Sequence, residues 1–162
     1  MSQPETIKHL VSSLSELEND LTKLCTILIK EQTALTDKQL DSIEQLAEQK
    51  TNLTQKIENT EQIRIGICAD LNIQPDKNSL GKWLKSQPKT IQQQVAKHWK
   101  RITYLGQKCA TQNQINGIMV AHQQRFTQDA LSILRGTDGG QDEYSEKGMQ
   151  KNKFNHNIIG KV

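Results

Sequence analysis

The sequence predicts an all-α protein: an elongated antiparallel three-helix coiled-coil-like bundle with a long third helix and a flexible C-terminal tail. Only 34% of the 162 residues are hydrophobic and 4% are aromatic, which is too little apolar material for a thick globular core. Straight-chain helix formers are abundant, and Pro4, Pro75 and Pro88 are the only prolines, so long stretches lack a helix breaker. Apolar residues recur at spacings of three and four, as in a coiled-coil seam. We therefore expect one helical bundle over residues 1–135 and a tail over 136–162.

The first helix is expected over about residues 4–35. Its apolar positions form one narrow stripe, which Glu31 interrupts near the end. Such a stripe buries a single line of side chains against neighbouring helices. The seam residues are Ile7, Leu10, Leu14, Leu17, Leu21, Leu24, Leu28 and Leu35.

The second helix is expected over about residues 37–71, with Thr36 or Asp37 as its N-cap. Lys50 and Arg64 fall at or near inward positions of this helix. There a long side chain can lay its stem on the seam and reach an acidic partner, such as the glutamate that interrupts the first seam. The apolar positions of this run are Ile43, Leu46, Leu53, Ile57, Ile67 and Leu71.

The third helix is expected to be longer than its partners. Pro75 ends the second helix, a short helix over about 79–86 covers the tip, and Pro88 fits the first turn of a helix over 88–135. At ~1.5 Å per residue this helix spans roughly 72 Å, against roughly 52 Å for the second helix. Its last turns therefore lack intramolecular cover, and their apolar residues are predicted to bind another protein chain. These residues are Phe126, Ala130, Leu131, Ile133 and Leu134.

Three helix-weakening residues, Asn113, Asn116 and Gly117, lie in the middle of the third helix. They fall on the stripe that also carries Gly106 and Cys109. We interpret them as a site of close helix packing with a polar layer that fixes the register, by analogy with buried asparagines in coiled coils. The alternative is that this weak stretch lets the third helix bend or open for a partner.

The tail differs in composition from the bundle, because it is rich in glycine, asparagine and charged residues. Such a segment buries too little surface to order itself. Tyr144 stands alone among polar residues, whereas Phe154, Ile158 and Ile159 share the spacing of a short helix with one apolar face. We expect this cluster to join the partner-binding surface, with a frayed terminus as the alternative.

The sequence offers no recognisable site for catalysis, a metal or a cofactor, so we expect a non-enzymatic protein that uses none of them. The histidines are scattered, and no histidine, cysteine or carboxylate spacing matches a zinc enzyme. The thiols Cys25, Cys68 and Cys109 lie on different predicted helices without a C-x-x-C pair, as expected for buried thiols in a reducing compartment.

Nucleic acid and membrane are not expected partners. The net charge of +3 is too small and too evenly spread for a nucleic-acid footprint. The densest basic cluster, residues 97–101, contains Trp99 and could contact single strands, but a packed Trp99 with cations in water is the simpler interpretation. No apolar run is long enough to cross a bilayer and no signal peptide is recognisable, so a cytoplasmic protein is expected.

The order of several short motifs resembles the FlgN family of flagellar type III export chaperones. The motifs are "EQTAL" closing the first helix, "LAEQKTNL" in the second, Arg64 further on, then "NQINGIMV", "LSILRG" and "YSEKG" in the tail. Each motif is short, and the resemblance rests on their order along nearly the whole chain. The tail departs from the family pattern because it continues well past Gly148.

The resemblance implies a chaperone that binds hook-associated proteins of the hook–filament junction, prevents their premature assembly and delivers them to the cytoplasmic domain of the flagellar export gate. It places client binding toward the C-terminus and assigns the export-gate contact to Tyr144. The competing interpretation is a self-associating coiled-coil structural or adaptor protein. The patterns also leave open a weak homodimer.

Overall fold

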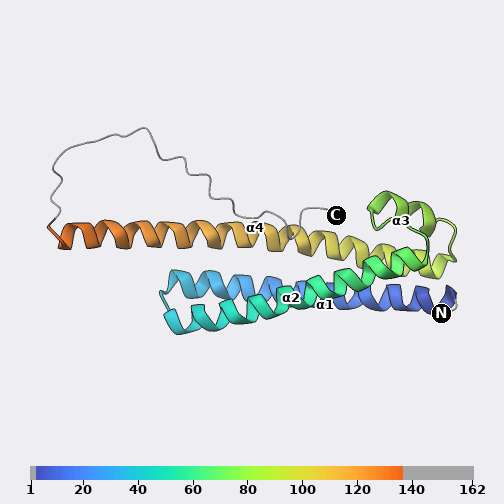
Figure 1. The fold of residues 1–162 in the computed structure, drawn as a ribbon, viewed down its shortest axis with the longest axis horizontal. Coiled ribbons are helices and arrows are strands. Elements are labelled where there is room, and N and C mark those ends of the chain that lie inside the picture. Colours follow the sequence, from blue (N-terminus) through green and yellow to red (C-terminus); the bar gives the residue numbers. More distant parts are fainter. Residues whose placement is uncertain (1–2, 137–162) are drawn as a thin grey trace.

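The computed structural model describes residues 3–136. This part of the chain contains helices α1 (Gln3–Thr36), α2 (Leu40–Asp70), α3 (Lys77–Leu84) and α4 (Lys89–Leu134), with no strand. They form a long rod in which α4 extends past the turn between α1 and α2 (Figure 1). The predicted all-α elongated bundle with a long last helix is confirmed, whereas the predicted tail beyond residue 136 lies outside the described residues.

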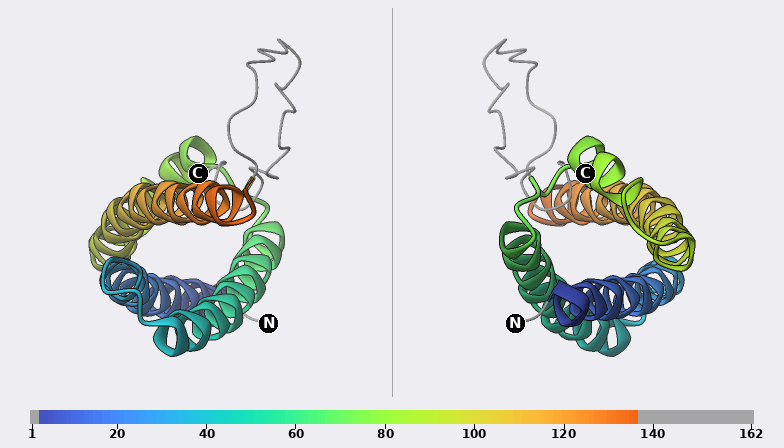
Figure 2. Two further views of the ribbon diagram at one scale, coloured as in Figure 1. Left: turned by 90° about the vertical axis from the view of Figure 1, so that its left-hand side faces the viewer. Right: turned by 90° about the vertical axis from the view of Figure 1, so that its right-hand side faces the viewer.

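Helix α1 is the central element of the bundle because it packs along both α2 and α4. α2 runs back along α1, and α4 then follows the direction of α1 (Figure 1). Hydrogen bonds between α1 and α4 join residues that are 80 to 88 positions apart along the whole pair, as expected for parallel helices. Seen end-on, the three long helices surround a central axis, with α3 beside one end of α4 (Figure 2).

The turn between α1 and α2 differs from the prediction. Lys38 takes a left-handed conformation (φ 54°), and the Gln39 N–H donates to the Ala34 carbonyl at 3.0 Å, as in a Schellman motif. The prediction of Thr36 or Asp37 as N-cap is therefore wrong, because Thr36 is the last residue of α1 and Asp37 lies in the turn that follows. Gln39 is the N-cap of α2, and its side chain makes no capping hydrogen bond.

The end of α2 has the same kind of turn, with a left-handed residue followed by a backbone hydrogen bond to a carbonyl of the last helical turn. Asn72 is left-handed (φ 57°), and the Ile73 N–H donates to the Cys68 carbonyl at 2.9 Å. Asp76 then caps α3 by accepting hydrogen bonds at 2.9 Å from the backbone N–H groups two and three residues later. The short helix therefore begins at Lys77, slightly earlier than expected.

The hydrophobic core is complete only toward the α3 end of the rod. α2 buries residues only in its second half, from Thr60 onward, and its earlier seam residues, such as Leu46 and Leu53, are half-buried. Near the α1–α2 turn, α4 consequently rests on α1 alone. The core consists of Leu10, Leu14, Leu17, Leu21, Leu24, Cys25, Leu28, Ile67, Leu80, Val95, Ile102, Leu105 and Cys109.

Arg64 and Trp99 join α2 to α4 in the complete part of the bundle. The Arg64 guanidinium lies 5.4 Å from the Trp99 ring centroid and donates to Glu61 at 2.6 Å. This hydrogen bond raises the pKa of Arg64 despite its burial. Trp99 is therefore engaged by the protein's own cation, which favours packing over a nucleic-acid patch.

Candidate protein-binding face on the distal part of α4

A polar layer around Asn116 joins α4 to α1 directly and to α2 through Glu31 of α1. Asn116 is 2% exposed, and its Nδ2 donates to the Leu28 carbonyl at 2.8 Å and to Glu31 Oε2 at 2.7 Å. The other Glu31 oxygen accepts from Lys50 of α2 at 2.6 Å, and Gln112 donates to Asn116 Oδ1 at 2.9 Å. The buried amide is thus fully paired, and the layer connects three helices in one register.

Asn113 and Gly117 do not take part in this layer, although the sequence pattern groups them with Asn116. Both are exposed, and a Cβ atom built on Gly117 would meet nothing within 4 Å. The expectation of close helix packing at these two residues therefore differs from the structure. The physical reason is that the first half of α2 is bound only to α1, so this side of α4 has no neighbour.

Beyond the polar layer, α4 outruns α1. Gln123 Nε2 donates to the Leu35 carbonyl at 2.7 Å, one residue before the last residue of α1. The segment that follows, residues 124–134, is called the distal arm here and is about 16 Å long. Its apolar side chains are largely exposed: Phe126 71%, Leu131 42%, Ile133 78% and Leu134 82%, with Ala130 half-buried.

The exposed apolar surface also extends back along α4 to residues that the sequence reasoning missed. Ile115, Ile118 and Val120 are exposed on α4. Ile133 follows Ile115 by eighteen residues, which is about five helical turns, so the two share one face. This spacing could have identified Ile115.

Two apolar stripes meet on the distal arm. Leu134 follows Asn116 by the same eighteen residues, about five turns, and so continues the seam that faces α1 earlier in the helix. Phe126 and Ile133 lie seven residues apart on the outer stripe. We call the combined surface the distal apolar face; it consists of Ile115, Ile118, Val120, Phe126, Ala130, Leu131, Ile133 and Leu134.

The distal arm carries few charges. Arg125 and Asp129 are its only charged side chains, and Arg135 follows at its end. An apolar helical surface without a dense charge pattern is suited to the apolar side of an amphipathic partner helix. Contiguous exposed apolar surface of this kind typically marks an interaction site.

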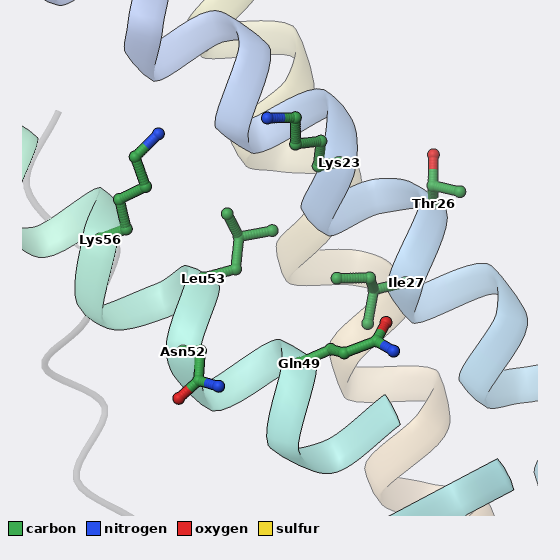
Figure 3. A pocket seen from close by; sticks show the side chains of 7 residues that line it. All are labelled: Lys23, Thr26, Ile27, Gln49, Asn52, Leu53 and Lys56. Atoms are coloured by element: carbon green, nitrogen blue, oxygen red, sulfur yellow. The ribbon is translucent and has the colours of Figure 1, made fainter. Parts of the chain in front are cut away.

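A groove between α1 and α2 is the competing surface (Figure 3). Ile27 and Leu53 form its apolar part and are half-buried. Its two cations are already engaged, because Asp20 lies 2.9 Å from the Lys56 amine and 3.7 Å from the Lys23 amine. Because Ile27 and Leu53 are half-buried, they expose a smaller fraction of apolar surface than Phe126, Ile133 and Leu134 do on the distal apolar face. Its full lining is Lys23, Thr26, Ile27, Gln49, Asn52, Leu53 and Lys56.

The remaining predicted contact residues, Tyr144, Phe154, Ile158 and Ile159, lie outside the described residues. In the described part of the chain, no helix combines the length and apolar character needed to cross a membrane. The same residues contain no cluster of three or more side chains suited to hold a metal ion.

Comparison with known proteins identifies a family that this chain matches. A family model described as FlgN protein matches residues 1–152. This range includes the whole bundle, the distal arm and Tyr144, and it ends before Phe154. No curated protein and no solved structure gives a significant match.

Proposed function

Because the chain belongs to the FlgN family of flagellar export chaperones, we propose that it binds hook-associated proteins of the hook–filament junction in the cytoplasm. In this role it keeps the termini of these proteins from assembling early and delivers them to the export gate. No chemical reaction is part of the proposal.

The distal apolar face is the observation that carries the proposal. Phe126, Ile133 and Leu134 are each more than two-thirds exposed, and no element of residues 3–136 covers them. A client segment that is unfolded before export can form an amphipathic helix on this face, burying its own apolar side against α4. Ordering of the client segment on binding costs conformational entropy and so lowers its affinity, which suits a chaperone that must release its client.

The tail supplies two further parts of the proposal. Phe154, Ile158 and Ile159 extend the client-binding surface, because their spacing gives one apolar helical side. Tyr144 contacts the cytoplasmic domain of the export gate, as the family resemblance implies. Replacing Tyr144 with alanine is expected to weaken capture of that domain while client affinity stays unchanged; equal loss of both would contradict separate roles.

Titration calorimetry with the C-terminal segment of a hook–filament junction protein tests the client site. The test variant is Phe126→Asp with Ile133→Asp, which removes apolar contact from exposed positions and leaves the core intact. The matched control is Ile63→Asp, because Ile63 is an exposed isoleucine on α2. We expect at least a tenfold loss of affinity, about 1.4 kcal/mol, for the double variant and none for the control.

The titration also separates the proposed function from the adaptor alternative. Binding that is unchanged in the double variant would move the client site off the distal arm. No binding by the unaltered chain, together with a tight homodimer in light scattering, would instead support a self-associating coiled-coil protein.

A further inference from the structure

Two buried thiols meet in the interface between α1 and α4. Cys25 Sγ and Cys109 Sγ are 2.7 Å apart, and both residues are buried. Cys25 Sγ also lies 3.6 Å from the Leu105 carbonyl oxygen, and Cys109 Sγ lies 3.6 Å from that of Leu21. Each carbonyl belongs to the residue four positions before the opposite cysteine, so the two thiols face each other reciprocally across the parallel helix pair.

The separation of the two sulfur atoms is small enough for a covalent bond to form between them. Sulfur atoms in a disulfide are about 2.05 Å apart, so a movement of about 0.7 Å joins the pair. The third thiol, Cys68, lies on α2, where the Arg64 Nη1 donates to it at 3.8 Å. Cys68 is therefore a buried thiol in a different setting and serves as an internal comparison.

We propose that Cys25 and Cys109 are a modification site: they form a reversible disulfide by exchange with a low-molecular-weight disulfide such as oxidised glutathione. The thiolate of one cysteine attacks a glutathione sulfur and releases one glutathione thiolate. The second cysteine, as a thiolate, attacks the protein-side sulfur of the mixed disulfide and releases the other. The two protons of the cysteine thiols pass to the released glutathione thiolates. One molecule of oxidised glutathione is thus reduced to two glutathione thiols, and one protein disulfide is formed.

The reaction is coupled to opening of the α1–α4 seam. Burial raises the pKa of the Cys109 thiol, and only the thiolate is a nucleophile. Exchange in the closed bundle is therefore slow, and it becomes faster when α4 separates from α1. Once formed, the bond closes a long loop and fixes the part of α4 from which the distal arm projects.

The test refolds the full unaltered chain from denaturant in a buffer of reduced and oxidised glutathione. Non-reducing peptide mapping then identifies the linked cysteines, and thermal unfolding is compared with and without dithiothreitol. We expect a Cys25–Cys109 crosslink within monomers, a free Cys68, and a rise in Tm of roughly 10 °C that dithiothreitol abolishes.

Single cysteine variants show which thiols form the crosslink. Cys68→Ala should retain the crosslink and the Tm shift, whereas Cys25→Ala and Cys109→Ala should lose both. Glutathione adducts on both cysteines, crosslinks between chains, or a Cys25–Cys109 bond that lowers Tm would each overturn the proposal.

Discussion

Asn116 and Asn113 show how closely the role of a residue depends on its angular position on α4. A step of three residues separates the two side chains by about 60° around the helix. Asn116 lies against α1 and is fully hydrogen-bonded, whereas Asn113 is exposed. The spacing predicted a polar layer in the middle of α4. Which residues next to Asn116 are buried depends on the path of α2, and this path could not be predicted from the spacing.

Substitution of Asn116 and of Asn113 by alanine should have unequal effects on stability. Asn116→Ala leaves the buried Glu31 Oε2 without its amide donor, so we expect the free energy of unfolding to fall by about 1–3 kcal/mol. Asn113→Ala changes an exposed side chain three residues away and should stay within about 0.5 kcal/mol of the unaltered chain. Urea unfolding measures both, and equal effects would contradict the assigned polar layer.

Asp76 provides a pH-dependent prediction. Hydrogen bonds, first of all from Ser79, lower the pKa of this carboxyl group below its usual range. A lowered pKa in the folded state stabilises the fold above the unfolded pKa of about 3.9, and this contribution is lost as pH falls through the folded pKa.

Asp76→Ala should therefore lower Tm at pH 7 and have a smaller effect at acidic pH. Asp76→Asn keeps a capping oxygen that does not titrate, so its Tm should stay near that of the unaltered chain at pH 7. A Tm difference between the alanine variant and the unaltered chain that does not change with pH would exclude the carboxylate as the cause.

At the scale of the elements, the number, order and approximate extent of the helices could be predicted, whereas their ends could not. The rules for helix starts look for a capping serine, threonine or aspartate. The α1–α2 turn instead uses the left-handed Lys38 and the backbone bond from Gln39 to Ala34. Non-glycine Schellman turns of this kind carry a weak sequence signal, because their hydrogen bonds involve only backbone groups.

Substitution of Gly117 tests whether the middle of α4 is a regular, exposed stretch of helix. It lies inside a continuous helix with open space around its would-be Cβ atom. Gly117→Ala should therefore raise the free energy of unfolding by about 0.5–1 kcal/mol, because alanine loses less backbone entropy in a helix.

The same variant examines the alternative that this stretch bends for a partner. Chemical unfolding should show the gain in stability, and calorimetry should show unchanged client affinity. A stabilised variant with markedly weaker client binding would support bending of α4 at Gly117.

At the scale of the whole molecule, unequal helix lengths create the proposed client-binding surface. α4 runs parallel to α1 and passes its end, so the seam residues of α4 continue where α1 has stopped. The sequence allowed this overhang to be predicted from helix lengths alone. The eighteen-residue spacing places Ile115 on the same face as Ile133, but the exposure of Ile115 could not be predicted, because it depends on α2 leaving this side of α4 uncovered.

The exposed arm also predicts weak self-association. At rising protein concentration, light scattering should detect a weak dimer of the unaltered chain that client peptide dissociates, because both use the distal apolar face. Phe126→Asp with Ile133→Asp should remain monomeric. A stable dimer that persists with client peptide would contradict a shared surface.

The most direct test of the central claim is hydrogen exchange of the α4 amides, measured with and without the C-terminal segment of a hook–filament junction protein. We predict that the client slows exchange from Ile115 to Leu134, with the largest change in residues 124–134, and leaves the groove between α1 and α2 unaffected. Protection confined to that groove, with the distal arm exchanging as before, would contradict the proposed client site.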